Sequence, residues 1–268
     1  MMESQELYLD LMKRCLTRSI FKPGYEFVPL PSKKIFSPLR KLIDSLPFRL
    51  VRPVNGRKTN GEMGWPLEAE TMIGLQRLDH LQHCIVDILE HKVPGDFIET
   101  GVWRGGAVIM MRAVLRAYQE KNRVVWAADS FSGLPKPDAK AYPADSKDKL
   151  WTQTALAVPL TEVKENFQRY DLLDEQVRFL EGVFKDTLPH FSAPRLSLLR
   201  LDGDLYESTM EALTYLYPKL SVGGYVIIDD YGALNSCRKA VEDYRTQFQI
   251  REAIIPVDSS CVYWKRLG

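Results

Sequence analysis

Four aspartates follow two apolar runs in the second half of the chain and are the side chains best suited to chemistry. Asp202 and Asp204 follow the first run, and Asp229 and Asp230 follow the second. If the runs are neighbouring parallel strands, the carboxylates meet at the edge where open α/β sheets bind ligands. They would repel one another there unless a cation or protonation relieved the charge. Because the donors are oxygens and no Cys or His accompanies them, the cluster favours Mg²⁺, with Mn²⁺ or Ca²⁺ as alternatives.

The spacing within this acidic cluster predicts two roles. Asp202, Asp229 and Asp230 can supply three metal ligands and leave coordination sites for two neighbouring oxygens of a substrate. A bound divalent ion would lower the pKa of a substrate hydroxyl and orient it. Asp204 is then the best-placed general base, because it lies two residues beyond a ligand and could take the proton. The alternative for Asp204 is a cap on the helix expected to begin near Ser208.

A glycine-rich segment forms a second candidate site. Residues 96–107 read DFIETGVWRGGA, a predicted strand followed by glycines and a helix whose amino end offers free amides. The spacing Gly101-x-x-x-Gly105-Gly106 departs from the GxGxxG of dinucleotide sites. Glu99 would repel a pyrophosphate but suits an ammonium group, such as that of S-adenosylmethionine. The segment therefore favours the methyl donor, with an ordinary strand-to-helix turn as the alternative.

A further acid, Asp129, ends the next apolar run, VVWAAD. A carboxylate at this place in a nucleotide-binding α/β unit can accept both ribose hydroxyls, and the neighbouring Phe131 could cover a base. A helix cap or turn is the alternative role for Asp129.

The spacing of apolar residues, glycines and prolines predicts the elements that position these sites. A first amphipathic helix is expected over 6–18, an irregular arm over 21–65 and a helix over 68–92. The expected strands are 96–102, 123–128, 176–180, 196–201 and 224–229, the helices 106–120, 160–170, 208–219 and 236–248, and the final hairpin 252–257 with 261–265. The alternation predicts an α/β fold with a doubly wound, mostly parallel seven-stranded sheet, a C-terminal antiparallel hairpin and an N-terminal extension.

Composition limits the classes of partner. The chain has 268 residues, 36 of them basic and 35 acidic, so its net charge of +1 argues against a nucleic-acid partner. The apolar runs are strand-length and no targeting segment opens the chain, which predicts a cytoplasmic protein without a membrane partner. The four cysteines form no CxxC pair, so we expect neither a zinc site nor disulfides. We expect one domain over 68–268, preceded by an extension over 1–67.

Five runs, taken in order and spacing, resemble the macrocin O-methyltransferase (TylF-type) family. They are ETGVWRGGA (99–107), AADSFSGLPKPD (127–138), EGVFKDTLP (181–189), LRLDGDLYEST (199–209) and VIIDDYG (226–232). The resemblance covers roughly residues 68–268. It implies a class I (Rossmann-like) methyltransferase that uses S-adenosylmethionine and Mg²⁺ on a hydroxyl of a sugar or another part of a natural product. It also implies a homodimer or larger homo-oligomer.

The same resemblance implies roles for individual residues. The family's metal ligands fall on Asp202, Asp229 and Asp230, and its proposed base falls on Asp204. The donor's methionine end would meet Glu99, Thr100, Gly101, Val102, Arg104, Gly105, Gly106 and Ala107, with Asp202 also facing the donor. Asp129 would bind the ribose, and Ser130, Phe131 and Gly182 would lie on the adenine side. Thr71 and Met72 resemble the part of the family's entry helix that closes over the donor.

Two other functions compete with this reading. One is a dehydrogenase-like, nucleotide-dependent enzyme, and the other is a non-catalytic S-adenosylmethionine-binding module whose acids only cap helices. We interpret the loop 134–151 as a lid over the acceptor and Arg200 as surface charge that balances the acids. His80 and His83 share a helix face, but we expect no metal pair there because no acid or cysteine completes the site.

Overall fold

The structure is a computed structural model that describes residues 3–21, 25–27, 51–53 and 66–268. The helices are α1 (Ser4–Leu16), α3 (Leu75–Glu90), α4 (Gly106–Ala117), α5 (Leu160–Arg169), α6 (Phe184–Thr187), α7 (Tyr206–Leu216) and α8 (Asn235–Gln247). The strands are β1 (Tyr25–Phe27), β2 (Val51–Pro53), β3 (Asp96–Thr100), β4 (Val125–Asp129), β5 (Val177–Glu181), β6 (Leu196–Leu201), β7 (Leu220–Ile228), β8 (Ile255–Pro256) and β9 (Val262–Lys265).

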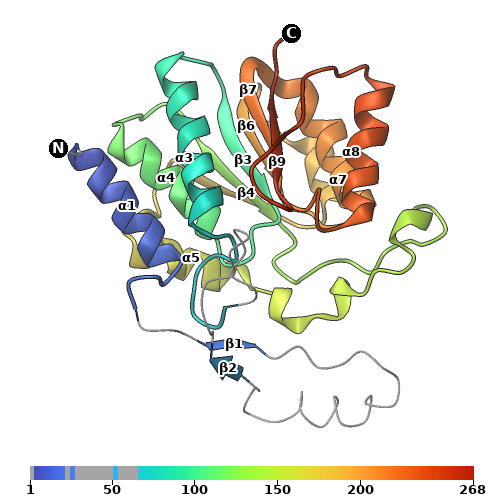
Figure 1. The fold of residues 1–268 in the computed structure, drawn as a ribbon, viewed down its shortest axis with the longest axis horizontal. Coiled ribbons are helices and arrows are strands. Elements are labelled where there is room, and N and C mark those ends of the chain that lie inside the picture. Colours follow the sequence, from blue (N-terminus) through green and yellow to red (C-terminus); the bar gives the residue numbers. More distant parts are fainter. Residues whose placement is uncertain (1–2, 22–24, 28–50, 54–65) are drawn as a thin grey trace.

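A seven-stranded sheet forms the centre of the molecule, in the order β5-β4-β3-β6-β7-β9-β8 (Figure 1). Strands β3 to β7 are parallel, whereas β9 runs antiparallel to both β7 and β8. The predicted doubly wound sheet with a C-terminal antiparallel hairpin is confirmed. The hairpin inserts β9 beside β7, so its turn lies close to the end of β7.

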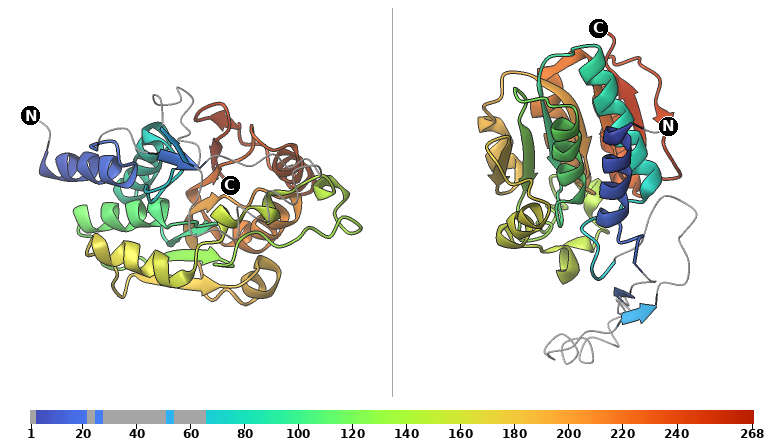
Figure 2. Two further views of the ribbon diagram at one scale, coloured as in Figure 1. Left: turned by 90° about the horizontal axis from the view of Figure 1, so that it is seen from below. Right: turned by 90° about the vertical axis from the view of Figure 1, so that its left-hand side faces the viewer.

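Helices cover both faces of the sheet because its strands are apolar on both sides. Phe97 and its neighbour Ile98 are both fully buried and point to opposite faces. Phe97 packs in the cluster that includes the inner faces of α1, α3, α4 and α5, and Ile98 packs in the cluster that includes α7 and α8. Figure 2 shows the two helical layers from below and from the side.

Helix α1 belongs to the same core as the sheet. Its buried residues Leu9, Met12 and Leu16 join the cluster that contains α3 and α4. The expected arm over 21–65 falls largely outside the described residues, and its described strands β1 and β2 pair with each other in a separate two-stranded sheet. The domain boundary after residue 67 stays a prediction.

The helix expected over 68–92 begins later, at Leu75, after Gly74 in an extended conformation. Tertiary contacts occupy the carbonyls that a longer helix would use. The guanidinium of Arg104 donates to the carbonyls of Pro66, Leu67 and Ala69, and the Gly106 amide donates to the carbonyl of Glu70. The spacing of apolar residues does not reveal this late start. Apolar residues before Gly74 are buried because their segment packs against the start of α4, and not because they belong to α3.

The strand order reverses between β3 and β6, and the ends of these two strands touch. Gly101 has a φ of +83°, and a Cβ atom there would lie 1.6 Å from the carbonyl oxygen of Asp202. The amide of Asp202 in turn donates to the carbonyl of Thr100 at 2.8 Å. Glycine is therefore required where the strands part, the point at which open α/β sheets bind ligands.

No helix in the described part of the chain combines the length and apolar character that crossing a membrane requires.

Candidate active site

A cleft opens at the carboxyl ends of the parallel strands. Its lining includes the predicted site residues Met72, Gly101, Asp129, Ser130, Asp202 and Asp204. Residues 133–136 border it on one side, and Glu207 and Glu211 of α7 on another. The structure thus brings the glycine-rich segment, the acid after β4 and the acid after β6 to one opening.

At the end of the cleft beside β3 and β4, Asp129 holds the glycine-rich loop. Its Oδ2 accepts the amide of Val102 at 2.7 Å and that of Trp103 at 3.4 Å, and its Oδ1 accepts the amide of Phe131 at 2.7 Å. Burial raises the pKa of Asp129, although these amides oppose the shift. The carboxylate therefore fixes the loop, and the remaining lone pairs of its oxygens are what it can offer to ribose hydroxyls.

The amides at the start of α4 are less free than the sequence indicated. The Gly105 amide donates to the carbonyl of Val102, and the Gly106 amide donates to that of Glu70. Gly106 has no room for a side chain, because a Cβ atom would lie 2.5 Å from Cβ of Thr71. The segment around Thr71 and Met72 therefore lies against the glycine-rich loop, although both residues precede the helix on which they were expected.

Three residues expected on the adenine side differ in their surroundings. Ser130 lines the cleft and donates its hydroxyl to the carbonyl of Gly133 at 2.6 Å. The ring of Phe131 is buried in the core and meets the ring of Phe179 edge-on at a centroid distance of 6.3 Å. Gly182, with a φ of +137°, links the ends of two strands, since its amide donates to the carbonyl of Asp129.

Beside the cleft, which Asp202 lines, Asp202, Asp229 and Asp230 lie together as predicted. One carboxylate oxygen from each falls within 4.8 Å of the others. Oδ2 of Asp230 is buried without a hydrogen-bond partner in the described part of the chain. Because oxygen donors so close together suit a hard divalent cation, the residues fit the expected Mg²⁺.

Arg200 is not a surface residue, which corrects the expectation from the sequence. It is 2% exposed on β6, and its Nη1 donates to Oδ2 of Asp202 at 2.8 Å. The same guanidinium forms short contacts with Glu99 and Asp229. The sequence did contain a sign of this burial. Arg200 is the single charged residue in an apolar strand, and a buried arginine needs acidic partners.

Glu99 is buried beneath the acidic cluster. One carboxylate oxygen pairs with Arg200, and the other has no partner among the described residues. Burial raises the pKa of Glu99 to about 8, Arg200 opposes the shift, and Asp202 adds to it. Thr100 and Val102 beside it are also buried, so Gly101 is the residue of this strand end that lines the cleft.

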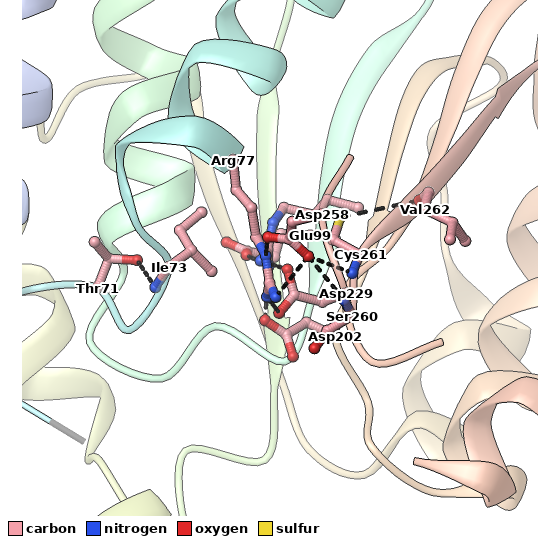
Figure 3. A network of polar contacts seen from close by, with 11 residues as sticks. Thr71, Ile73, Arg77, Glu99, Asp202, Asp229, Asp258, Ser260, Cys261 and Val262 are labelled. Carbon is pink, nitrogen blue, oxygen red and sulfur yellow. Dashed lines mark hydrogen bonds and ion pairs between the residues drawn. The ribbon is translucent and has the colours of Figure 1, made fainter. Parts of the chain in front are cut away.

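A second buried arginine, Arg77, reaches the cluster from the first turn of α3 (Figure 3). Its Nη1 donates to Oδ2 of Asp229 at 2.6 Å. Its Nε and Nη2 donate to the two oxygens of Asp258 at 2.6 and 3.1 Å. The sequence analysis missed this residue. Arg77 stands four residues before the buried Leu81, on the same apolar face of its helix, and a charged residue on that face could have indicated a buried arginine.

Asp204 follows β6 in a left-handed conformation, with a φ of +61°. Burial and the nearby Asp202, Asp148 and Asp229 raise its pKa well above the usual value. It does not cap α7, whose N-cap residue is Leu205 and has no side-chain cap. The capping alternative for Asp204 is therefore excluded, and the role of general base stays a prediction.

The cap of α7 comes from the loop expected to act as a lid. Asp145 is 1% exposed, and its two carboxylate oxygens accept the amides of Tyr206 and Glu207 at 2.7 and 3.0 Å. The loop is thus anchored directly behind Asp204, while its residues 134–136 and Asp138 line the cleft.

The histidines of α3 lie apart from this site. The rings of His80 and Tyr263 pack at a tilt with a centroid distance of 4.2 Å, and Nε2 of His80 lies 3.5 Å from Sγ of Cys84, a cysteine neighbour that was not expected. Burial lowers the pKa of His80 to about 4. Among the described residues, the group of side chains that could hold a metal ion is that of the three aspartates.

Comparison with known proteins places this geometry in a family. The sequence profile of the family described as macrocin O-methyltransferase (TylF) matches residues 5–266. A demethyldecarbamoylnovobiocin O-methyltransferase of Streptomyces niveus is 53% identical over 203 residues, 75% of this chain and 78% of the relative. An 8-demethyl-8-(2,3-dimethoxy-alpha-L-rhamnosyl)-tetracenomycin-C 4'-O-methyltransferase of Streptomyces olivaceus is 48% identical over 265 residues, 98% of this chain and 94% of the relative. The structure of the O-methyltransferase NovP matches with a TM-score of 0.84 and 44% identity, covering 99% of this chain and 100% of that one.

Proposed function

The chain belongs to the macrocin O-methyltransferase (TylF) family, and from this premise we propose that it methylates a sugar hydroxyl of a natural product with S-adenosylmethionine and Mg²⁺. The enzyme class follows from the family, and the fold and family imply the methyl donor. We propose the divalent ion and the acceptor. The observation that carries the proposal is the cluster of Asp202, Asp229 and Asp230, which reaches the cleft through Asp202 at a point that Asp204 also lines.

The donor belongs at the glycine-rich end of the cleft. Gly101 lines the cleft there, and Asp129, which lines it too, holds the loop and would bind the ribose. Glu99 is buried beneath the acidic cluster and does not line the cleft, so its role toward the donor's ammonium group stays a prediction from the sequence. The ring of Phe131, expected to cover the base, is buried in the core and does not line the cleft.

The acceptor belongs at the acidic end. Asp202, Asp229 and Asp230 would hold the divalent ion, which when bound lowers the pKa of a coordinated hydroxyl and orients it. Asp204 would accept the proton of that hydroxyl. Asp204 lines the cleft two residues beyond the proposed ligand Asp202, which supports this role. The hydroxyl oxygen would bond to the methyl carbon as the bond between that carbon and the donor sulfur breaks, which leaves S-adenosylhomocysteine and a proton on Asp204.

The kind of acceptor is inferred from the relatives. The tetracenomycin enzyme is named for methylation of a compound that carries a rhamnosyl group, and it matches 98% of this chain. The cleft also offers the charged and polar groups Lys136, Glu207 and Glu211, which suit a hydroxylated ligand.

We also propose a homodimer or larger homo-oligomer, which size-exclusion chromatography with light scattering tests.

The test compares metal-stripped wild type with Asp230→Asn and Asp204→Asn. S-adenosylhomocysteine should raise the melting temperature of all three proteins, whereas Mg²⁺ should add a further increase in wild type and Asp204→Asn only. With a panel of glycosylated acceptors, Asp204→Asn should lose about 100-fold or more in turnover. Full activity in the presence of a chelator would remove the metal from the proposal, and full activity of Asp204→Asn would remove the base.

A further inference from the structure

We propose that Arg77 and Asp258 act as a charge-neutral positioning pair that orients Asp229 for the divalent ion. The inference rests on the metal site of the proposed function and adds two residues to it. Neither residue lies in the acidic cluster itself, and each comes from an element far from β7 in the sequence.

The first step is the contact that Arg77 makes with the cluster. Its Nη1 lies 2.6 Å from Oδ2 of Asp229, and the two side chains are 4% and 8% exposed. The other oxygen of Asp229 is held by Arg200. Both oxygens of this proposed ligand therefore have fixed directions, and one lone-pair direction on each remains for a cation. Outer partners of this kind commonly orient a metal ligand.

The second step is the way in which Arg77 is itself held. Asp258 receives Nε at 2.6 Å and Nη2 at 3.1 Å, a two-point contact that fixes the plane of the guanidinium. Oδ1 of Asp258 also accepts the amides of Ser260 and Cys261 at 2.9 and 2.8 Å. Asp258 is thus tied to the turn of the β8–β9 hairpin, and Figure 3 shows the chain of contacts from this turn to Asp229.

The third step concerns charge. An unpaired arginine beside Asp229 would repel a divalent ion and reduce its affinity. Asp258 cancels that charge, so the pair can direct Asp229 without removing the negative potential that binds the ion. Arg200 differs, since it contacts Glu99, Asp202 and Asp229 and balances part of their charge.

Asp258→Asn tests the pair. The new side chain keeps an oxygen that can accept the amides of Ser260 and Cys261, but it removes the negative charge and turns an amide group toward Nε of Arg77, so the two-point contact is lost as well. We would measure Mn²⁺ binding by electron paramagnetic resonance and S-adenosylhomocysteine binding by calorimetry, both without acceptor. Mn²⁺ affinity should fall about tenfold or more, while affinity for S-adenosylhomocysteine should not change.

Two further variants serve as controls. Asp174→Asn breaks a comparable two-point contact, with Arg112 on α4, away from the cluster, and should bind Mn²⁺ like wild type. The double variant Arg77→Met with Asp258→Asn removes the charge and the orientation together, and its Mn²⁺ affinity should lie between wild type and Asp258→Asn.

The outcomes separate this inference from the proposed function. If wild type binds no Mn²⁺, or binds it unchanged after Asp230→Asn, the proposed metal site fails and this inference fails with it. If wild type binds Mn²⁺ through Asp230, two results overturn the positioning pair alone. One is wild-type affinity in Asp258→Asn. The other is equal weakening of Mn²⁺ and S-adenosylhomocysteine binding in Asp258→Asn and the double variant, which would indicate general disruption.

Discussion

The two ends of the cleft are held in shape by different chemistry. At the donor end, Asp129 accepts backbone amides of the glycine-rich loop, so neutral dipoles surround a single carboxylate. At the acidic end, Arg200 and Arg77 pair with a group of carboxylates, so full charges face one another. The donor end depends on the path of the backbone, whereas the acidic end depends on charge balance and should respond to cations.

The largest effect is expected from Gly101→Ala, which changes the backbone at the glycine-rich end of the cleft. A Cβ atom would collide with the Asp202 carbonyl at 1.6 Å, where the two ends of the cleft meet, and the φ of +83° disfavours alanine. We expect a loss of more than about 4 kcal/mol in the free energy of unfolding, measured in urea. Gly133→Ala is the control, since φ is +91° but the nearest atom is a methyl carbon at 3.2 Å. It should lose about 1–2 kcal/mol. Equal losses in the two variants would contradict the role of the backbone contact.

Arg200→Met tests the charged end. The change leaves Glu99, Asp202 and Asp229 buried without their shared partner. In metal-free protein we expect unfolding in urea to show a loss of about 3 kcal/mol, because removing one member of a buried ion pair strands the other. The control is Arg112→Met on α4, which removes an arginine with a partly exposed acid partner and should cost clearly less. If both variants lost the same free energy of unfolding, the acidic end would not depend on charge balance more than the ion pair on α4 does.

Asp129→Asn tests whether the donor end depends on accepted amides. The amide group of asparagine replaces one acceptor oxygen with a donor, which would face a backbone N–H. Affinity for S-adenosylhomocysteine, measured by calorimetry, should fall by about 2 kcal/mol, while the stabilisation by Mg²⁺ persists. Glu120→Gln, at an acid that accepts the amide of Asn122 away from the cleft, is the matched control and should bind like wild type. Loss of the Mg²⁺ response in Asp129→Asn would show that the two ends are not separate.

Asp145→Ala should have the smallest effect of these variants. Asp145 accepts backbone amides, as Asp129 does, but it lies near the acidic end of the cleft. The variant removes the cap of α7, and urea denaturation should show a loss of about 1 kcal/mol. Asp138→Ala in the same loop caps no helix and should change stability less. Should Asp145→Ala match wild type, the loop would not be anchored there.

The same contrast explains what the sequence could predict. The sheet, its hairpin and the meeting of Asp202, Asp229 and Asp230 follow from local patterns, because strand ends in a parallel sheet share one edge. Arg77 and Asp145 could not be predicted in the same way, since each acts on a residue distant in the chain. The late start of α3 also depends on a distant contact, that of Arg104 with the preceding carbonyls.

The anchor at Asp145 divides the loop after β4 into two stretches that can be exchanged separately. Residues 134–144 begin beside Ser130, and residues 146–157 lead back to α5. A chimera that imports either stretch from a relative to alter acceptor choice must keep this aspartate in register with the start of α7. Each of the two stretches, 134–144 and 146–157, can therefore be exchanged without the other.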